Sequence, residues 1–368
     1  MKRLHLFKST SLPNSILNGL LGLAVLIAFG VVVWATLPAA GDKSHRSPVE
    51  LGAEGPVTQA GSDIYLPYIS LTPSGWSSQT SGVSNLLYGV SCAAGGQNCM
   101  AVGQQIALYT SNGGDSWSPV TPSGIAGLVL NDVSCPSASR CVAVGQRSGS
   151  AGVILVTNNA GGSWTPLNQS YRMDAVDCIS TSECVAVGDE SEARFTYNGG
   201  ASWENGRLGN TPLFGVDCLS SKTCWMVGVG GRVIGTYPNA GGPGGIGVIS
   251  KKDLLLNEGK SLLSISCIQQ DTCVTVGEIG KIFKTTNTGG SWSSRPSGTG
   301  VTLTGVSCPG FSLCYTVGDG GTILISLDTG STWSPDDSPV ATNLKDIDCY
   351  GPSNCLAVGA GGTILLRQ

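Results

Sequence analysis

The residues best suited to chemistry in this sequence are its fourteen cysteines, all of which lie after residue 90. They come in pairs, six of which enclose five residues while the first encloses six. Paired cysteines serve as disulfides, metal ligands or redox dithiols. Because the spacing is not that of a zinc knuckle and no Cys-x-x-Cys occurs, we predict structural disulfides formed in an oxidising compartment. The predicted bridges are Cys92–Cys99, Cys135–Cys141, Cys178–Cys184, Cys218–Cys224, Cys267–Cys273, Cys308–Cys314 and Cys349–Cys355.

Histidine is nearly absent from the chain. His5 and His45 are the two histidines, and both precede the first cysteine. The cysteine-bearing region therefore cannot form a Ser-His-Asp or Cys-His nucleophile pair or a His-ligated zinc site. We expect no metal and no cofactor. The net charge of −4 provides no basic field, so we expect no nucleic-acid binding.

The segments that must position the cysteines repeat seven times. Successive second cysteines are 42, 43, 40, 49, 41 and 41 residues apart, which is the length of a propeller blade. Each unit has an apolar segment before the first cysteine, a segment ending in Val-Gly after the second, and an Ile-Leu run. The sequence predicts an all-β fold, a monomeric seven-bladed β-propeller of four-stranded blades over residues 74–368. A hairpin of the first two strands would bring each cysteine pair about 5 Å apart between Cα atoms, which a disulfide accepts.

The two ends of the repeat region complete one blade. The last unit stops at Gln368 without a Trp-containing turn, whereas Trp76 stands alone before the first unit. Trp76 lies 16 residues before Cys92, as Trp333 lies 16 residues before Cys349. We predict that the segment around Trp76 supplies the fourth strand of the last blade and closes the ring.

The fourth unit departs from the repeat. Its turn at Thr236–Gly242 lacks Trp, and about eight extra residues follow, through Lys251 and Lys252. The insertion is either a tolerated surface loop or a protrusion that contacts a partner.

The N-terminal segment predicts a membrane anchor. Residues 1–15 form a basic cytoplasmic tail, and residues 16–37 are uncharged and mostly apolar. At 1.5 Å per residue, a helix over 16–37 would span about 33 Å, enough for a bilayer core. The basic tail places the rest of the chain outside, with 38–73 as an extracytoplasmic linker. A cleaved signal followed by secretion is the alternative.

The repeated turn resembles a known family. The run Gly-x-x-Gly-x-Ile followed by Thr-x-Asn/Asp-x-Gly-Gly-x-Ser/Thr-Trp is similar to the BNR or Asp-box repeat. Examples are Asp319–Ile323 with Ser326–Trp333, and Glu278–Ile282 with Thr285–Trp292. Over residues 74–368 the pattern resembles the photosystem II stability/assembly factor family of sialidase-like propellers. The resemblance implies the fold more than an activity, because such turns occur in enzymes and in binding proteins. The paired cysteines are not part of the general family pattern.

The predicted function is that of a non-catalytic scaffold, anchored in the cell membrane with its propeller outside. Its partner would be a protein or a cell-surface glycan. The contact surface is expected on the propeller face that carries the loops after the Val-Gly segments and the linkers between blades. Charged residues of those loops are Arg147, Asp189, Glu190, Arg232, Glu278, Lys281 and Asp319, and the linkers add Arg172, Arg207 and Arg295.

A sialidase-like glycoside hydrolase is the alternative function. That activity needs an arginine cluster for the substrate carboxylate, and the sequence lacks the Arg-Ile-Pro signature of the family. Other glycosidases need two carboxyl groups about 5–10 Å apart. Asp189, Glu190 and Glu192 share one loop, and Asp319 would have to face them across the channel. We therefore predict no catalytic residues.

Overall fold

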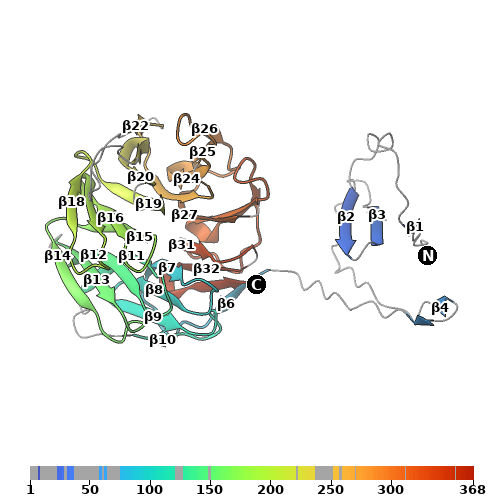
Figure 1. Cartoon of the computed structure of the whole chain (residues 1–368), viewed down its shortest axis with the longest axis horizontal. Helices are drawn as coiled ribbons and strands as arrows, with labels where there is room; N and C mark the ends of the chain where they lie inside the picture. Colours follow the sequence, from blue (N-terminus) through green and yellow to red (C-terminus); the bar gives the residue numbers. More distant parts are fainter. Residues whose placement is uncertain are drawn as a thin grey trace. The chain divides into compact units, whose positions relative to one another are not determined.

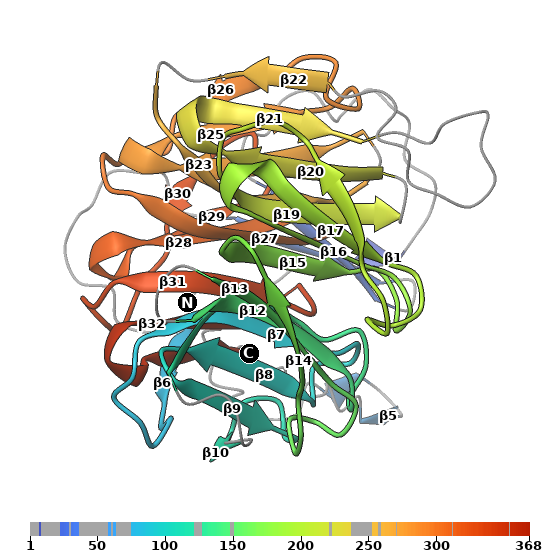
Figure 2. The same cartoon turned by 90° about the vertical axis from the view of Figure 1, so that its left-hand side faces the viewer.

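The computed structural model divides the chain into two units, residues 1–70 and 71–368. It describes residues 7–8, 23–28, 31–36, 58–59, 62–63, 75–120, 127–147, 151–220, 223–236, 252–256, 259–269, 271–310, 312–352 and 354–368. The second unit contains seven four-stranded antiparallel sheets, each of which is one blade. Figure 1 shows these sheets arranged around a common centre, and Figure 2 shows strands of neighbouring blades stacked beside one another. The predicted seven-bladed all-β propeller is confirmed.

Blades 1 to 6 each use four consecutive strands, and the first strand of each lies next to the central axis. Blades 1 and 2 comprise β7 (Leu87–Cys92), β8 (Cys99–Gly103), β9 (Ile106–Thr110), β10 (Ser118–Pro119), β11 (Leu128–Ser134), β12 (Cys141–Arg147), β13 (Gly152–Thr157) and β14 (Thr165–Gln169). Blades 3 and 4 comprise β15 (Met173–Cys178), β16 (Cys184–Gly188), β17 (Glu192–Thr196), β18 (Glu204–Arg207), β19 (Leu213–Ser220), β20 (Thr223–Gly228), β21 (Arg232–Gly235) and β22 (Lys252–Leu255). Blades 5 and 6 comprise β23 (Leu262–Cys267), β24 (Cys273–Gly277), β25 (Ile282–Thr285), β26 (Ser293–Arg295), β27 (Leu303–Gly310), β28 (Leu313–Gly318), β29 (Ile323–Ser326) and β30 (Ser334–Pro335).

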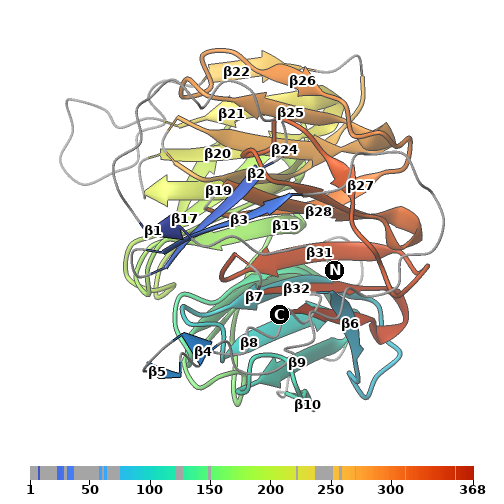
Figure 3. The ribbon, with the colours of Figure 1, turned by 90° about the vertical axis from the view of Figure 1, so that its right-hand side faces the viewer.

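Blade 7 joins the two ends of the propeller. Its strands are β31 (Leu344–Cys349), β32 (Cys355–Gly359), β33 (Ile364–Arg367) and β6 (Trp76–Gln79). β6 pairs with β33 in a register that places Trp76 opposite Arg367 and Gln79 opposite Ile364. Figure 3 shows β6 in blade 7 beside the C-terminus. The predicted closure of the ring by the Trp76 segment is therefore confirmed.

Short 3₁₀ turns connect the second and third strands in blades 3 to 7. They are η1 (Asp189–Ser191), η2 (Val229–Gly231), η3 (Glu278–Gly280), η4 (Asp319–Gly321) and η5 (Ala360–Gly362). These turns and the linkers between blades lie at one end of the blades, which we call the linker face. The cysteine hairpins and the Thr-x-Asn turns lie at the other end, since Cys184 pairs with both Cys178 and Thr196.

The hydrophobic core consists of seven clusters, one at each interface between neighbouring blades. Both faces of each blade are covered, which explains why the second strands are almost entirely buried and lack a polar stripe. In every blade except blade 4, the repeated Trp packs into the interface with the preceding blade. Trp117 packs against blade 7, for example, and Trp292 lies edge-to-face against Trp225 of blade 4 at 5.8 Å.

All seven predicted disulfides are present, with Cα atoms 4.0 to 4.1 Å apart. No free cysteine occurs among the described residues. Each bridge joins the end of a first strand to the start of the second strand in the same blade. Because every loop is short, the bridges hold blade hairpins together and do not link blades to one another.

The first unit contains a three-stranded sheet in the order β1 (Phe7–Lys8), β3 (Val31–Thr36), β2 (Leu23–Ala28), and a pair of β4 (Thr58–Gln59) with β5 (Ser62–Asp63). Of the predicted membrane span at 16–37, the structure describes only the two segments in β2 and β3. The rest of the span and most of the linker at 38–73 lie outside the described residues. No helix in the described part of the chain has the length and apolar character needed to cross a membrane.

Most of the blade-4 insertion also lies outside the described residues. The structure places Lys252 at the start of β22, the fourth strand of blade 4, so this lysine is not part of the insertion. The described residues resume there and complete the blade.

Candidate functional site: the central channel and its linker-side mouth

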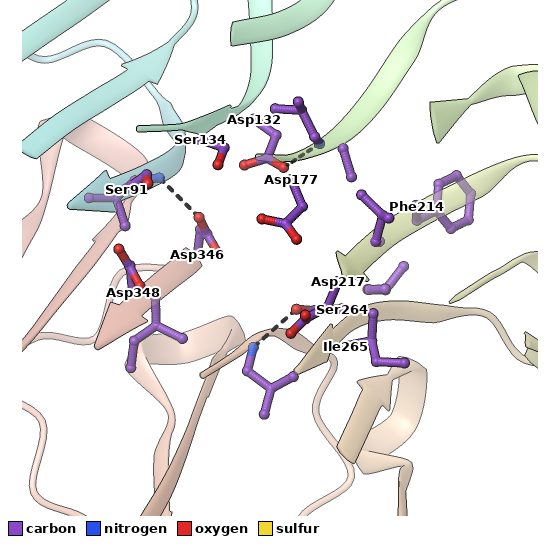
Figure 4. Close-up of a pocket in the computed structure, with 18 of the residues that line it drawn as sticks. Ser91, Asp132, Ser134, Asp177, Phe214, Asp217, Ser264, Ile265, Asp346 and Asp348 are labelled. Carbon is purple, nitrogen blue, oxygen red and sulfur yellow. Dashed lines mark hydrogen bonds between the residues drawn. The ribbon is translucent and has the colours of Figure 1, made fainter. Parts of the chain in front are cut away.

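The first strands of all seven blades surround a central cavity of about 320 Å³. Its lining includes Asp132, Asp174, Asp177, Asp217, Asp346 and Asp348. Lys345 is the one cation in this described lining. Figure 4 shows carboxylates from blades 2, 3, 4 and 7 directed towards the middle of the channel. None of these aspartates is among the site residues predicted from the sequence.

The residue before each first cysteine connects one blade to the next. These residues form what we call the Ser/Asp belt: Ser91, Ser134, Asp177, Asp217, Ser266, Ser307 and Asp348. Each side-chain oxygen accepts a hydrogen bond from the backbone N–H of the first cysteine in the following blade, at 2.7 to 3.1 Å. The bond from Cys92 to Asp348 closes the circle between blades 1 and 7. Since one lone pair of each belt carboxylate is used in this way, these aspartates have a structural role.

A second, incomplete layer of channel side chains comes from residues two positions before the belt residues in the sequence. Asp346 accepts the backbone N–H of Val90 at 2.9 Å, and Asp132 accepts that of Val176 at 2.8 Å. Ser264 accepts the N–H of Val306 at 3.2 Å in the same way. Figure 4 shows these bonds as dashed lines. The carboxylates of both layers therefore face the channel while they hold neighbouring blades in register.

Burial raises the pKa values of the channel carboxylates. It raises the pKa of Asp217 to about 8, with repulsion from Asp177 adding to the effect. The pKa of Asp346 rises to about 7 by burial, against the opposing hydrogen bonds from Val90 and Ile347. Asp132 is raised well above its ordinary value by burial and by the Asp346 charge. Burial and repulsion between neighbouring carboxylates therefore favour the protonated form of these channel carboxyl groups.

We predict that mild acid stabilises the propeller. A carboxyl group whose pKa is higher in the folded than in the unfolded state binds a proton more tightly when folded. The free energy of unfolding should therefore rise as pH falls from about 8 towards about 4, the window set by Asp217. The Asp217→Asn variant keeps an oxygen for the N–H of Cys267 and removes the charge. It should be more stable than the parent by about 1–2 kcal/mol at pH 8 and equal to it near pH 4.

Guanidinium denaturation at the two pH values measures this difference. Asp337→Asn is the matched control, because Asp337 is exposed and outside the channel. A destabilised Asp217→Asn variant at pH 8 would show that the ionised carboxylate supports the fold.

A β-bulge near the start of every first strand shapes the linker-side mouth of the channel. In each blade the pairing skips one residue, as between Leu213 and Gly215 in β19. The skipped residues form the mouth ring: Tyr88, Asn131, Asp174, Phe214, Leu263, Thr304 and Lys345. All seven line the channel cavity. The Gly that ends each second strand allows this path, since a Cβ on Gly188 would lie 2.0 Å from the carbonyl oxygen of Arg172.

The mouth ring combines apolar and polar side chains. Phe214 and Leu263, from the adjacent blades 4 and 5, give one apolar sector. Asn131 donates to the carbonyl oxygen of Met173 at 2.8 Å, and Thr304 donates to that of Leu344 at 2.9 Å.

Two ion pairs add charge at the same level of the channel. Asp174 pairs with Arg172 at 2.9 Å, and Lys345 pairs with Asp319 at 3.7 Å. Burial raises the pKa of Asp174 to about 7, although the Arg172 charge opposes this shift. The mouth thus offers an aromatic and aliphatic sector next to a charged one, a composition suited to protein recognition.

The charged loop residues predicted from the sequence lie on five different blades around the linker face. Arg147 is at the end of β12 and donates to Asn168 at 3.2 Å. Asp189 pairs with Arg172 at 3.3 Å, and Glu190 is the centre of η1. Two further predicted residues lie in or beside η3: Glu278 accepts the backbone N–H of Ser261 at 2.9 Å, and Lys281 follows the turn.

Two of the predicted acidic and basic groups are buried. Arg232 is only 7% exposed, and its guanidinium donates to Ser191 at 2.8 Å and to the carbonyl oxygen of Leu208 at 2.9 Å. It therefore ties blade 4 to blade 3 and does not present its charge on an open surface. Glu192 is 9% exposed and pairs with Arg194 in the same strand.

The arrangement needed by a sialidase is not found in the described channel. No arginine lines the cavity, so no cluster there is placed to bind a substrate carboxylate. Asp319 is paired with Lys345, and Asp189 with Arg172. Within the described residues, no group of three or more His, Cys, Asp or Glu side chains is placed to hold a metal ion.

Comparisons with known proteins identify the architecture. Comparison with protein-family models finds no match, and no curated protein matches the chain. Among solved structures, "YCF48 from Cyanidioschyzon merolae" superposes with a TM-score of 0.63 at 18% identity, covering 80% of this chain and 99% of that one. The chain has the YCF48 fold. "YCF48 bound to D1 peptide" superposes with a TM-score of 0.65 at 17% identity, over 79% of this chain and 96% of the other.

YCF48 is a photosystem II assembly factor, so the resemblance of the repeats to that family is confirmed for the fold. The second structure shows that a propeller of the YCF48 fold has been solved with a peptide bound.

Proposed function

We propose that this chain is a non-catalytic scaffold that binds a segment of a partner protein at its mouth ring. The observation that carries this proposal is the β-bulge repeated in all seven blades, which places one residue from each blade in the lining at the linker-side end of the channel. The Ser/Asp belt supports the proposal, because its carboxylates are committed to backbone N–H groups. A peptide bound to the similar YCF48 propeller supports a protein segment as the ligand class.

The proposal includes the predicted cellular location. An N-terminal helix at 16–37 would anchor the propeller in the cell membrane and keep it on the outer side, where its seven disulfides form. Cleavage of this helix and secretion is the alternative. A cell-surface glycan remains the alternative ligand, because the aromatic Tyr88 and Phe214 at the mouth could stack on sugar rings.

Partner capture by a mouth variant tests the proposed function. Replacing Phe214 and Leu263 by Ser removes the apolar sector while leaving the belt and the blade interfaces intact. The full chain, solubilised in detergent, should retain a partner protein from envelope extract. The double variant should retain at least about tenfold less of that protein. Equal recovery by both chains would contradict mouth-ring binding. Retention of a protease-resistant, periodate-sensitive ligand would instead identify a glycan.

A further inference from the structure

An isoleucine on the linker face adopts a backbone conformation that its side chain disfavours. Ile279 is the centre of η3 and has φ +49°. The equivalent centres in η2, η4 and η5 are Gly230, Gly320 and Gly361, with φ between +67° and +70°. The left-handed region suits glycine, whereas a β-branched residue there is a strained outlier. Burial does not explain the isoleucine, because 47% of it is exposed.

Ile279 lines a groove of about 390 Å³ at the linker face of blade 5. The blade-5 groove is formed by Ile279, Gly280, Lys281 and the segment 294–300. Blade 7 has a groove at the same place, formed mainly by 78–84 and 361–364. The pairing of Ile282 with Arg295 corresponds to that of Ile364 with Gln79, so the two grooves align residue by residue.

Three of the aligned positions at which the two grooves differ carry a charge or the exposed aliphatic side chain in blade 5. Blade 7 has Gly361, Thr363 and Gln79 where blade 5 has Ile279, Lys281 and Arg295. The blade-7 groove has no charged residue in its described lining, and the blade-5 groove has two cations and no carboxylate. The blade-5 groove therefore differs from the blade-7 groove by an exposed aliphatic side chain and two positive charges.

The two cations of the blade-5 groove lack acidic partners. Neither Lys281 nor Arg295 has an ion pair or a side-chain hydrogen bond within the described part of the chain, and Nε of Arg295 is buried without an acceptor. Glu278 forms no ion pair with either cation in the described part of the chain, and its carboxylate accepts the backbone N–H of Ser261. A strained apolar side chain beside two unpaired cations indicates a contact that is completed by another molecule.

We propose that the blade-5 groove docks an acidic segment of a partner protein, with an aliphatic side chain against Ile279 and with Glu or Asp carboxylates against Lys281 and against Arg295. Charge complementarity selects this occupant, since the groove supplies donors for a carboxylate and no acceptor charge for a cation. The inference goes beyond the proposed function, because it involves no residue of the mouth ring.

Fluorescence polarisation with a designed probe tests the charge complementarity. The probe is the labelled peptide Gly-Leu-Glu-Leu-Glu-Gly with blocked ends, so that side chains supply its only carboxylates. The full chain in detergent should bind it saturably at low ionic strength, and bind the Gln counterpart roughly tenfold more weakly. Lys281→Thr/Arg295→Gln should remove this preference, whereas Thr363→Ala/Gln79→Ala in the blade-7 groove should not. Absence of saturable binding, or equal binding of both peptides, would overturn the proposal.

A second variant separates docking from folding. Ile279→Asn places a residue that tolerates the left-handed region at the turn, so it should raise the melting temperature of the free chain. It should also weaken probe binding several-fold, because the aliphatic contact is lost. Gln105→Asn, at the equivalent turn of blade 1 with φ +57°, should leave probe binding unchanged. A lower melting temperature for Ile279→Asn would show that Ile279 is packed for stability and would refute a docking role.

The Phe214→Ser/Leu263→Ser mouth variant should bind the acidic probe like the parent chain. This result distinguishes failure of the groove from failure of the mouth ring.

Discussion

Replacing Trp76 by Ala is expected to lower the free energy of unfolding of the propeller by about 3–5 kcal/mol, the usual effect of truncating a buried Trp. Trp76 is 7% exposed and packs edge-to-face on Tyr315 of blade 6 at 6.1 Å. Its indole N–H donates to Asp336 at 3.0 Å, and the Arg367 guanidinium lies 5.9 Å from its ring. The substitution therefore weakens the one blade that is assembled from both ends of the repeat region.

The effect should exceed that of a local cavity, because the closing strand holds the first and last units together. Ser78→Ala is the matched control, since Ser78 lies on the same strand β6 with its side chain exposed. Thermal unfolding should show a large loss of unfolding free energy for Trp76→Ala. The loss for Ser78→Ala should be less than about 0.5 kcal/mol. Equal stability of the two variants would mean that β6 does not close the ring.

Reduction of the disulfides is the second change with a large expected effect. A loop of six residues, as in Cys135–Cys141, corresponds to about 2 kcal/mol of chain entropy. Seven such loops together approach the whole stability of a typical domain, about 5–15 kcal/mol. We therefore expect the fully reduced propeller to be unfolded or only marginally folded at 37 °C.

The loss of stability in one blade should also affect its neighbours, because the backbone N–H of each first cysteine donates a hydrogen bond to the Ser/Asp belt residue of the preceding blade. A single-pair variant, Cys135→Ala/Cys141→Ala, isolates one bridge. It should lose about 2 kcal/mol or somewhat more, because the small cavities add to the entropy effect. Calorimetry with and without a phosphine reductant measures both quantities. A melting temperature unchanged by complete reduction would contradict a stabilising role for the bridges.

The repeat made most of the fold predictable from the sequence. Cysteine spacing and the Val-Gly segments fixed the blade number and the hairpins, and the isolated Trp76 indicated the closure. Such features are local and occur in every unit, so seven copies reinforce one interpretation. The N-terminal region has no second copy, and its predicted span at 16–37 remains a prediction.

The candidate site was harder to predict. The mouth ring depends on a β-bulge in each first strand. The bulged residue is Tyr in one blade and Lys in another, so no residue type indicates the position of the bulge in the sequence. The belt could have been recognised, because Ser or Asp precedes the first cysteine in all seven units. Arg232 resembled an exposed loop charge, yet its side chain turns inward and ties two blades together. Side-chain direction at a strand end is set by the neighbouring blade, which a single unit does not reveal.

The residues that support the channel are distinct from the mouth ring, for which we propose recognition of a partner. The belt and the layer above it hold neighbouring blades together through carboxylates and hydroxyls. The mouth ring varies from blade to blade in size and charge, as expected of a surface that recognises one partner.

Photo-crosslinking in the native cells tests the central claim most directly. A photoreactive amino acid in place of Leu263 would lie in the mouth ring. The same amino acid in place of Leu327 would lie on the opposite face, where the Leu327 side chain is 68% exposed. The account predicts a discrete protein adduct from position 263 and none of the same mass from position 327. Adducts of equal yield from both positions, or none from the mouth, would contradict a protein-binding channel mouth.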